Sequence, residues 1–455
     1  MSRFPRFLSN TISSASNVRL RAPLGLVGVS GLLVALACSS SDPVNPGPDG
    51  STTKPDTGTS SGNTDSGEVD AGEDVIIPTE PEVQFFGRID MTDPAQPRMS
   101  WPGAMILANF TGTEVKASFR ETPTPEAQGT GVQTFSQYNV IIDGVQTSIL
   151  KLKLGASADV VLATGLPEGD HQIILYRRTE ASIGSTQFLG FDFGTGKLGI
   201  PPIRPTKKVE IIGDSISVGW GAESKGPYDG TELHPNNPYI AGTECVKEGL
   251  DDTTAAQKRQ DQQNNQVTYG ALIAKRFGAE GHVVAWSGRG VSRNLNDIVA
   301  PTVPEMYDRA FAGAAAPKWD ATKWIADVVI LNLGTNDFVK DNTPPNFVAK
   351  YEAFVRVIRG QYPTAWIYAL NGPMLTYYDD PGVAGESPRK EAEKAIKGTV
   401  DKLVGEGDLK IRYLNIDQDY QHYGCEFHPY KDSHAAIAAA IEQEIKVDVK
   451  WKTVP

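Results

Sequence analysis

The chain is poor in the residues that most often bind metal ions. Three cysteines and six histidines occur among its 455 residues, and they are scattered rather than grouped at the spacing of metal ligands. A glycine-rich phosphate-binding loop is also missing, because Gly288-Arg289-Gly290 is too short to form one. The sequence therefore predicts a protein that uses neither a metal nor a cofactor.

Positive charge is scarce as well. The formal net charge is −12, and residues 1–37 hold four arginines and no acid, so the rest of the chain is more acidic still. An acidic chain has no electrostatic basis for binding nucleic acid or anionic lipid headgroups. We therefore expect no nucleic-acid partner and favour a neutral one.

The chain also lacks a hydrophobic run of membrane-spanning length near its start. The apolar stretch Leu24–Ala37 has about 14 residues, which suits a signal peptide better than a membrane span. It ends in Leu-Val-Ala-Leu-Ala-Cys, which resembles a bacterial lipobox and predicts a lipidated Cys38 after removal of residues 1–37. We expect a secreted lipoprotein anchored to the cell envelope, at the outer membrane or cell surface. A plain signal peptide is the alternative.

Two changes of composition divide the remaining chain. Residues 38–82 are rich in Ser, Thr, Asp, Gly and Pro, which predicts a disordered tether. Residues 83–203 carry short apolar runs between turn residues and predict an all-β jelly-roll sandwich. The expected strands are Met105–Phe110, Val115–Phe119, Asn139–Ile142, Val160–Ala163 and Gln172–Tyr176.

Residues 204–450 alternate apolar strand-like runs with helical stretches, which predicts an α/β domain whose parallel sheet is covered on both faces. Residues 251–266 are a polar insertion, for which we expect a loop or an exposed helix. The expected strands are Val209–Ile212, His282–Trp286, Asp327–Leu331, Ala365–Leu370 and Ile411–Ile416. The expected helices are Tyr269–Arg276, Asn346–Gly360, Pro388–Val404 and Ser433–Ile445.

Three unusual segments directly follow three of these strands, and they contain Ser215, Gly288 and Asn336. In an open parallel sheet, ligands bind beyond the carboxyl ends of the strands, so the three segments should converge. Ser215 is the candidate nucleophile. The N–H groups of Ser215 and Gly288 and the side-chain amide of Asn336 could stabilise an oxyanion. Asp214 and Asp337 are interpreted as structural residues that hold their turns.

The blocks Gly213-Asp214-Ser215, Gly288 and Gly334-Thr335-Asn336-Asp337 resemble those of the GDSL, or SGNH, hydrolases. The resemblance implies a flavodoxin-like three-layer fold and a catalytic histidine near the C-terminus. His428 is followed by the proline typical of the family and precedes the last predicted helix, whereas His434 falls at the start of that helix, where capping or packing explains it. His428 is therefore the predicted base.

The segment around His428 departs from the usual Asp-x-x-His pattern, because Cys425 stands where the acid is expected. A sandwich followed by Gly-Cys-acid-aromatic-His-Pro is similar to carbohydrate esterase family 2. The resemblance implies a Ser–His dyad in which the backbone carbonyl of Glu426 orients His428 and Phe427 lines the substrate site. Cys245 and Cys425 could form a disulfide, or both could stay free thiols.

The resulting hypothesis is a serine esterase that removes O-acetyl groups from polysaccharides of the xylan, mannan or glucan type. Its partner would be an acetylated polysaccharide or oligosaccharide, and it would touch a membrane only through its lipid anchor. Two alternatives stay open. One is another SGNH enzyme, such as a lipase, thioesterase or peptidoglycan esterase, and the other is a surface lipoprotein that mainly binds carbohydrate.

Overall fold

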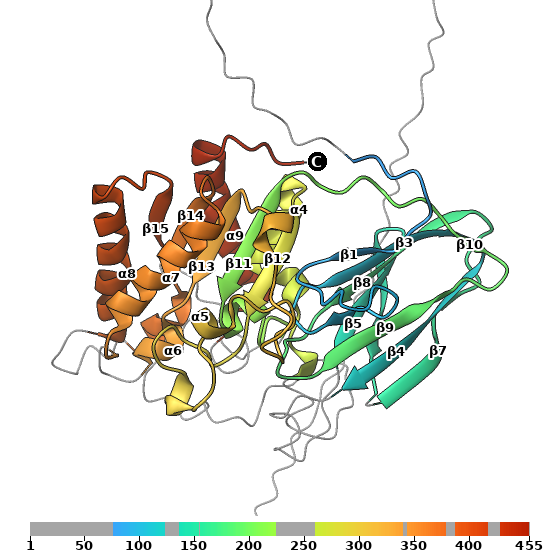
Figure 1. Ribbon diagram of the computed structural model, residues 1–455, viewed down its shortest axis with the longest axis horizontal. Helices are drawn as coiled ribbons and strands as arrows, with labels where there is room; N and C mark the ends of the chain where they lie inside the picture. Colours follow the sequence, from blue (N-terminus) through green and yellow to red (C-terminus); the bar gives the residue numbers. More distant parts are fainter. Residues whose placement is uncertain are drawn as a thin grey trace, which may run out of the picture. The chain divides into compact units, whose positions relative to one another are not determined.

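The computed structural model describes residues 76–122, 136–153, 155–223, 260–339, 344–378, 387–416 and 428–454 (Figure 1). The first part of this region consists of strands, and the second part alternates strands with helices. Cys38, Cys245, Cys425, Glu426 and Phe427 lie outside the described residues.

Strands of the first part pair in two antiparallel sheets. One has the order β1-β3-β8-β5-β6 with β10 beside β3, and the other has the order β2-β9-β4-β7. Side chains from both sheets share one core that includes Phe110, Phe119 and Ile173, as in a sandwich. The strands are β1 (Gln84–Phe86), β2 (Arg98–Met99), β3 (Met105–Thr111), β4 (Glu114–Thr122), β5 (Gln137–Ile142), β6 (Val145–Lys151), β7 (Gly155–Thr164), β8 (Asp170–Arg177), β9 (Ser185–Asp192) and β10 (Lys197–Leu198).

The five strands predicted for this part fall within β3, β4, β5, β7 and β8. β1, β2, β6, β9 and β10 were not among the predicted strands. Most side chains of β6 are exposed, so its sequence carries little apolar pattern. A strand needs only a neighbour for its backbone hydrogen bonds, and β6 obtains one by pairing with β5.

The second part contains one parallel sheet in the order β12-β11-β13-β14-β15. Counted along the chain, this is the 2-1-3-4-5 order of flavodoxin-like folds. The predicted α/β parallel sheet is therefore confirmed. Its strands are β11 (Lys208–Gly213), β12 (Glu280–Ala285), β13 (Val328–Asn332), β14 (Trp366–Asn371) and β15 (Ile411–Asn415).

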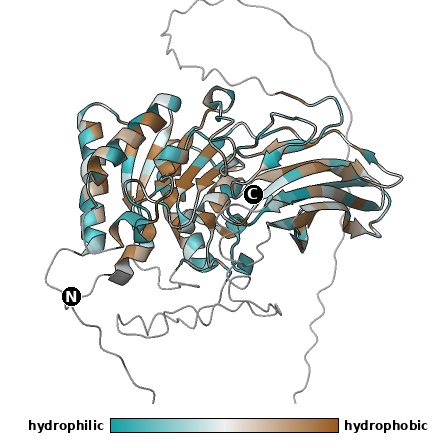
Figure 2. Cartoon of the chain, turned by 60° about the horizontal axis from the view of Figure 1, so that its bottom comes forward, coloured by the Kyte–Doolittle hydropathy of each residue, from teal (hydrophilic) through white to brown (hydrophobic). Residues whose placement is uncertain are grey.

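Helices cover both faces of the parallel sheet, because its strands are apolar on both faces. Side chains of α4 and α9 pack on one face, and those of α7 and α8 pack on the other. Figure 2 shows the strands as largely hydrophobic and the outer helices as partly hydrophilic. The helices are α2 (Ser215–Val218), α4 (Tyr269–Phe277), α5 (Val303–Met306), α6 (Thr335–Phe338), α7 (Phe347–Gln361), α8 (Pro388–Gly405) and α9 (Lys431–Asp448), with short 3₁₀ turns η2 (Asn265–Val267), η3 (Leu295–Asp297), η4 (Ala321–Lys323) and η5 (Pro373–Tyr378).

Local signals fix where the longer helices begin and end. The hydroxyl of Thr268 accepts a hydrogen bond from the N–H of Ala271 and caps α4, which ends at Gly278 in a left-handed conformation with φ of 60°. Ser387 caps α8 in the same way, and Pro388 occupies its first turn.

The polar segment Gln260–Asn265 corrects a prediction. It was expected within a loop or an exposed helix, yet all six of its residues are buried, with exposed fractions of 4% or less. Residues of the sandwich bury it: Gln137 donates to Asp261 at 2.5 Å, and the hydroxyl of Tyr176 donates to Asn265 at 2.8 Å. Partners from both parts of the chain satisfy hydrogen bonds of Asp261, Gln263, Asn264 and Asn265, which offsets the cost of burying these side chains.

A buried ion pair also joins the two parts. The guanidinium of Arg88, just after β1, lies 2.6 Å from the carboxylate of Glu210 in β11, and both side chains are fully buried. Glu210 further accepts hydrogen bonds from the hydroxyls of Tyr307, at 2.6 Å, and Tyr362, at 3.3 Å. The ion pair and these hydrogen bonds replace the interactions with water that each charge loses on burial.

Replacing Glu210 with alanine should therefore destabilise the protein strongly. The change leaves the Arg88 guanidinium buried without its counterion, which costs about 3–5 kcal/mol. Denaturant unfolding measures the loss. The matched control is Asp401→Ala, because Asp401 pairs with Lys397 on the surface of α8 and should cost under about 1 kcal/mol. Equal losses in the two variants would contradict the role given to the buried pair.

Candidate functional site

Ser215 stands at the carboxyl end of the central region of the parallel sheet. It follows β11 and opens the short helix α2, and the Asp214 carboxylate caps that helix by accepting the Ile216 N–H at 3.0 Å. The preceding Gly213 has no room for a side chain, because a Cβ there would lie 1.9 Å from the Ser217 hydroxyl oxygen. The turn therefore holds Ser215 in a fixed position, and the prediction that Asp214 holds this turn agrees with the geometry.

His428 meets Ser215 although 213 residues separate them in the sequence. The His428 Nε2 lies 2.7 Å from the Ser215 Oγ, and the two residues are only 8% and 6% exposed. A neutral imidazole nitrogen accepts a hydrogen bond from the hydroxyl in such a contact, which is the arrangement that activates a serine nucleophile. The structure thus brings together the two residues that the sequence paired.

Gly288 and Asn336 follow the two strands that flank β11. Gly213 is in register with Ala285 of β12 on one side and with Asn332 of β13 on the other. The three turns therefore leave the sheet at one edge. Gly288 adopts a left-handed conformation with φ of 74°, which glycine reaches without strain.

The side-chain amide of Asn336 connects these turns. Its Nδ2 donates to the carbonyl of Arg289 at 2.9 Å and lies 3.3 Å from the Asp214 carboxylate. Asn336 therefore contacts the residue next to Gly288 and the residue next to Ser215. The contact with Asp214 is the longer and therefore the weaker of the two. The N–H that makes it could instead donate to a substrate oxygen.

Asp337 holds the turn that carries Gly288. Its carboxylate accepts hydrogen bonds from the N–H groups of Val291, Ser292 and Arg293 at 2.7–2.9 Å, and from the Ser292 hydroxyl at 2.9 Å. Burial raises the pKa of Asp337 above its usual range, although these donors favour the ionised form. Asp337 thus has the structural role that the sequence predicted.

Asp214 is the other buried carboxylate beside Ser215. The pKa of Asp214 is raised to about 7, chiefly by burial and also by the Asp337 carboxylate, while the hydrogen bond from the Ile216 N–H acts in the opposite direction. Its side chain faces the helix it caps and the Asn336 amide, and no bond from it to His428 is among the contacts of the described residues.

His434, the rejected alternative base, lies in α9 and is fully buried. Its Nδ1 accepts the Tyr269 N–H at 3.3 Å, and its ring stacks against the Tyr269 ring at 6.0 Å. Burial, together with the nearby His428, lowers the pKa of His434 to about 3. His434 is therefore a neutral packing residue, as predicted.

The structure adds a residue that the sequence did not indicate. Trp220, five residues after Ser215, places its ring 6.1 Å from the His428 ring. An aromatic residue directly after Gly219, at the end of the nucleophile turn, was the available signal. Glu426, which should orient His428, and Phe427, which should line the site, lie outside the described residues, as do Cys245 and Cys425.

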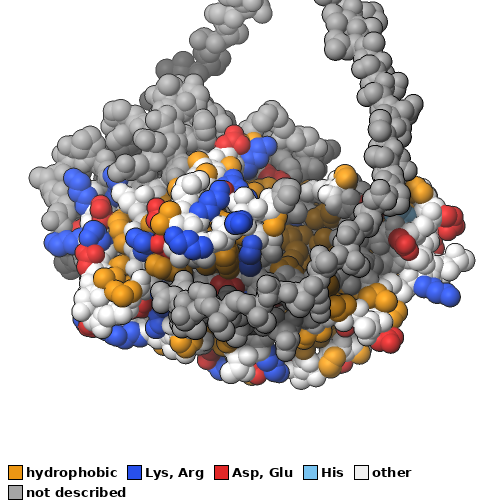
Figure 3. All heavy atoms as spheres, turned by 90° about the horizontal axis from the view of Figure 1, so that it is seen from above, with side chains coloured by type: hydrophobic (Ala, Val, Ile, Leu, Met, Phe, Trp, Pro, Cys, Tyr) orange, Lys and Arg blue, Asp and Glu red, His pale blue; other side chains and the backbone are white. Residues whose placement is uncertain are grey.

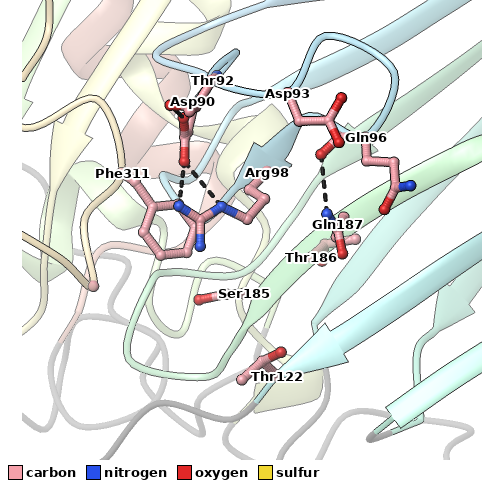
Figure 4. Close-up of a pocket in the computed structure, with 11 residues that line it drawn as sticks. Asp90, Thr92, Asp93, Gln96, Arg98, Thr122, Ser185, Thr186, Gln187 and Phe311 are labelled. Atoms are coloured by element: carbon pink, nitrogen blue, oxygen red, sulfur yellow. Dashed lines mark hydrogen bonds and ion pairs between the residues drawn. The ribbon is translucent and has the colours of Figure 1, made fainter. Parts of the chain in front are cut away.

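A polar pocket of about 480 Å³ is lined by residues other than Ser215 and His428 (Figure 4). Its Asp90 carboxylate accepts hydrogen bonds from Arg98 and from the Thr92 hydroxyl, and the Arg98 guanidinium lies 4.9 Å from the Phe311 ring centre. Arg98 therefore neutralises Asp90, and Asp93 is the remaining charged residue of the lining.

The surface and the titratable residues add little to the site. On the face seen in Figure 3, basic and acidic side chains are interspersed with hydrophobic ones. Among the described residues, no group of three or more His, Cys, Asp or Glu side chains could hold a metal ion. Within the same ranges, no helix combines the length and apolar character that a membrane crossing needs.

Two family models match the chain. The Carbohydrate esterase 2 N-terminal family covers residues 85–202, and the GDSL-like Lipase/Acylhydrolase family covers residues 211–436. The fold and the site therefore define a GDSL-type hydrolase domain that follows a carbohydrate esterase 2 sandwich. The chain belongs to carbohydrate esterase family 2, as its sequence predicted.

Named relatives agree with this assignment. The chain is 31% identical over 386 residues to the cellulase/esterase CelE of Acetivibrio thermocellus, covering 83% of this chain but only 41% of CelE. It is 24% identical to an acetylxylan esterase / glucomannan deacetylase of Cellvibrio japonicus, covering 83% and 91% of the two chains. A family two carbohydrate esterase from Clostridium thermocellum, solved in complex with cellohexaose, has a TM-score of 0.67 at 29% identity and covers 81% and 100% of the two chains.

The burial of His434 predicts that the free energy of unfolding decreases in acid. In the unfolded chain this imidazole titrates near its ordinary pKa of 6.5, whereas in the fold its pKa is about 3. Acid therefore protonates the unfolded chain first, and stability should fall as the pH drops from about 6.5 toward 3. His434→Gln should weaken this dependence, measured by urea unfolding at several pH values.

His171 provides a comparison for that measurement, because its pKa is shifted in the opposite direction. The Pro167 carbonyl and the Asp143 carboxylate hold the pKa of His171 above its usual value, so its contribution has the opposite sign. That contribution is present below about pH 6.5 and is lost as the pH rises. If His434→Gln and the wild type lose stability equally in acid, the buried neutral imidazole is not responsible.

Proposed function

We propose that this protein is a serine esterase that removes O-acetyl groups from polysaccharides. The observation that carries the proposal is the 2.7 Å contact between Ser215 Oγ and His428 Nε2. This contact lies at the sheet edge where the Gly288 and Asn336 turns also end. Membership of carbohydrate esterase family 2 and the names of the relatives support the substrate class.

In the proposed first step, Ser215 attacks the acetyl carbonyl carbon while His428 Nε2 takes the hydroxyl proton. The carbonyl oxygen becomes an oxyanion, which the N–H groups of Ser215 and Gly288 and the Asn336 amide stabilise. The intermediate then breaks the bond to the sugar oxygen, and His428 returns the proton to that oxygen as the leaving group. Ser215 is left acetylated.

The second step hydrolyses the acetyl-enzyme. A water molecule attacks the acetyl carbon, His428 takes one of its protons, and the same donors hold the new oxyanion. Collapse of this intermediate breaks the bond to Ser215, which recovers its proton from His428, and acetate leaves. Neither step uses a metal or a cofactor.

The proposed catalytic unit is a dyad rather than a triad. Asp214 and Asp337 are engaged by the turns that they hold, so neither is assigned to the imidazole. The backbone carbonyl of Glu426 is proposed to accept a hydrogen bond from the His428 Nδ1–H, and Phe427 to line the substrate site with Trp220. A Cys245–Cys425 disulfide would hold the loop before His428, and peptide mapping of the non-reduced protein tests it.

The lipid anchor is a separate proposal. The apolar stretch before Cys38, its Leu-Val-Ala-Leu-Ala-Cys ending and the polar residues after it favour cleavage and lipidation at Cys38. This would anchor the protein to the cell envelope of a bacterium. Mass spectrometry of the N-terminal peptide of the mature protein checks for the lipid.

Replacing Ser215 with alanine should abolish acetate release. The variant lacks the attacking oxygen, so release from p-nitrophenyl acetate and from acetylated xylan and mannan should fall to background while the unfolding curve stays close to that of the wild type. Retained release in the variant would overturn the assignment. A preference of the wild type for long acyl chains would favour a lipase, and glycan binding without any acetate release would favour a binding protein.

Replacing Asn336 with alanine should lower kcat by about 10²–10³-fold, because the variant loses one oxyanion donor. KM for p-nitrophenyl acetate should change little, since the donor acts mainly on the charged intermediate. Steady-state kinetics with enzyme concentrations set by active-site titration measure both parameters. An unchanged kcat would remove Asn336 from the oxyanion site.

A further inference from the structure

Glu180 belongs to the sandwich, yet its carboxylate contacts the turn that carries Gly288. It lies three residues after β8 and is only 1% exposed. Its Oε2 accepts a hydrogen bond from the Ser287 N–H at 2.7 Å. Ser287 directly precedes Gly288, so a residue of one domain holds a proposed oxyanion turn of the other.

The contact with Glu180 completes a set of hydrogen bonds around Gly288. The Gly288 carbonyl accepts the Leu295 N–H at 2.8 Å, and the next carbonyl, that of Arg289, accepts the Asn336 amide at 2.9 Å. The Ser287 N–H is bound on the other side of Gly288. These bonds hold the peptide groups before and after the planar Ser287–Gly288 peptide, and so they restrict the direction of the Gly288 N–H.

The second oxygen of Glu180 is linked to the nucleophile turn. Glu180 and Gln263 exchange two hydrogen bonds, one from each partner, at 3.2 and 3.3 Å. The residues after Gln263 contact the end of α2: the Asn264 N–H donates to the Gly219 carbonyl at 3.1 Å, and the Asn265 amide donates to the Ser217 carbonyl at 2.9 Å. One carboxylate thus connects the turns of Gly288 and Ser215.

A buried carboxylate suits this task. Hydrogen bonds from a backbone N–H to an ionised acceptor are about twice as strong as those between neutral groups. Burying a charge is costly unless such partners compensate it. Asp261, at the same interface, instead bonds Gln137 and Lys151 of the sandwich.

We infer that Glu180 is a positioning residue of the esterase: by holding the Trp286–Ser287 peptide, it restricts the next peptide, Ser287–Gly288, so that the Gly288 N–H faces the oxyanion. This inference rests on the proposed function. It makes the sandwich part of the catalytic machinery in addition to any role in binding sugar.

Three variants separate the length of the Glu180 side chain from its charge. Glu180→Gln keeps the length and one acceptor oxygen, Glu180→Asp keeps the charge but is one methylene shorter, and Glu180→Ala removes both. A small misplacement of a catalytic donor costs up to about 100-fold in rate. We expect kcat for p-nitrophenyl acetate to fall about 10- to 100-fold in Ala and Asp and less in Gln, with KM changed less than about twofold.

Asp261→Asn is the matched control, because it alters a buried carboxylate at the same interface. Its kcat should stay close to that of the wild type. All values are referred to active sites titrated with a p-nitrophenyl phosphonate, so that loss of folded protein does not lower kcat. The phosphonylation rate of Ser215 should fall in the same order as kcat, since that reaction also builds negative charge on an oxygen.

The possible results are distinct. The order wild type, Gln, then Asp and Ala supports the inference. Unchanged kcat in every Glu180 variant, with only a lower melting temperature, overturns it and makes Glu180 an interface residue. An equal loss of kcat in Asp261→Asn also overturns it. If Glu180→Ala does not fold, the comparison of Gln with Asp decides. A wild type without esterase activity rejects the proposed function and this inference together.

Discussion

The register of three adjacent parallel strands is the constraint on which the rest of the site depends. β11 lies between β12 and β13, and Gly213 is aligned with the last residue of each neighbour. The chain must turn at these three ends, and the turns meet because the strands stop together. Backbone pairing thereby places a nucleophile, a glycine N–H and an asparagine amide close to each other.

Turns at the edge of a sheet have unpaired backbone groups, and this protein satisfies them with buried acids. Asp214 caps the turn of Ser215, Asp337 binds three consecutive N–H groups, and Glu180 binds the N–H of Ser287. Each acid thus holds a turn in place and is not assigned a step in the reaction. The site is therefore rich in carboxylates, although the proposed chemistry uses a hydroxyl and an imidazole.

The sequence predicted much of the fold because the parallel strands are apolar on both faces and the turn residues are distinctive. Ser215, Gly288, Asn336 and His428 could be chosen because each directly follows a strand or precedes the last helix. The burial of Gln260–Asn265 could not be predicted, since it depends on polar partners in the sandwich that lie more than a hundred residues away. For the same reason, Glu180 has no local pattern that points to Ser287.

The distance along the chain between the two reacting groups has a consequence for biogenesis. The hydroxyl comes with the first strand of the α/β domain, whereas the imidazole precedes α9, which docks on α4 beside the first two strands. A chain whose last helix has not yet docked holds a serine without a base. Under the proposed mechanism, hydrolysis therefore requires that the last helix has docked.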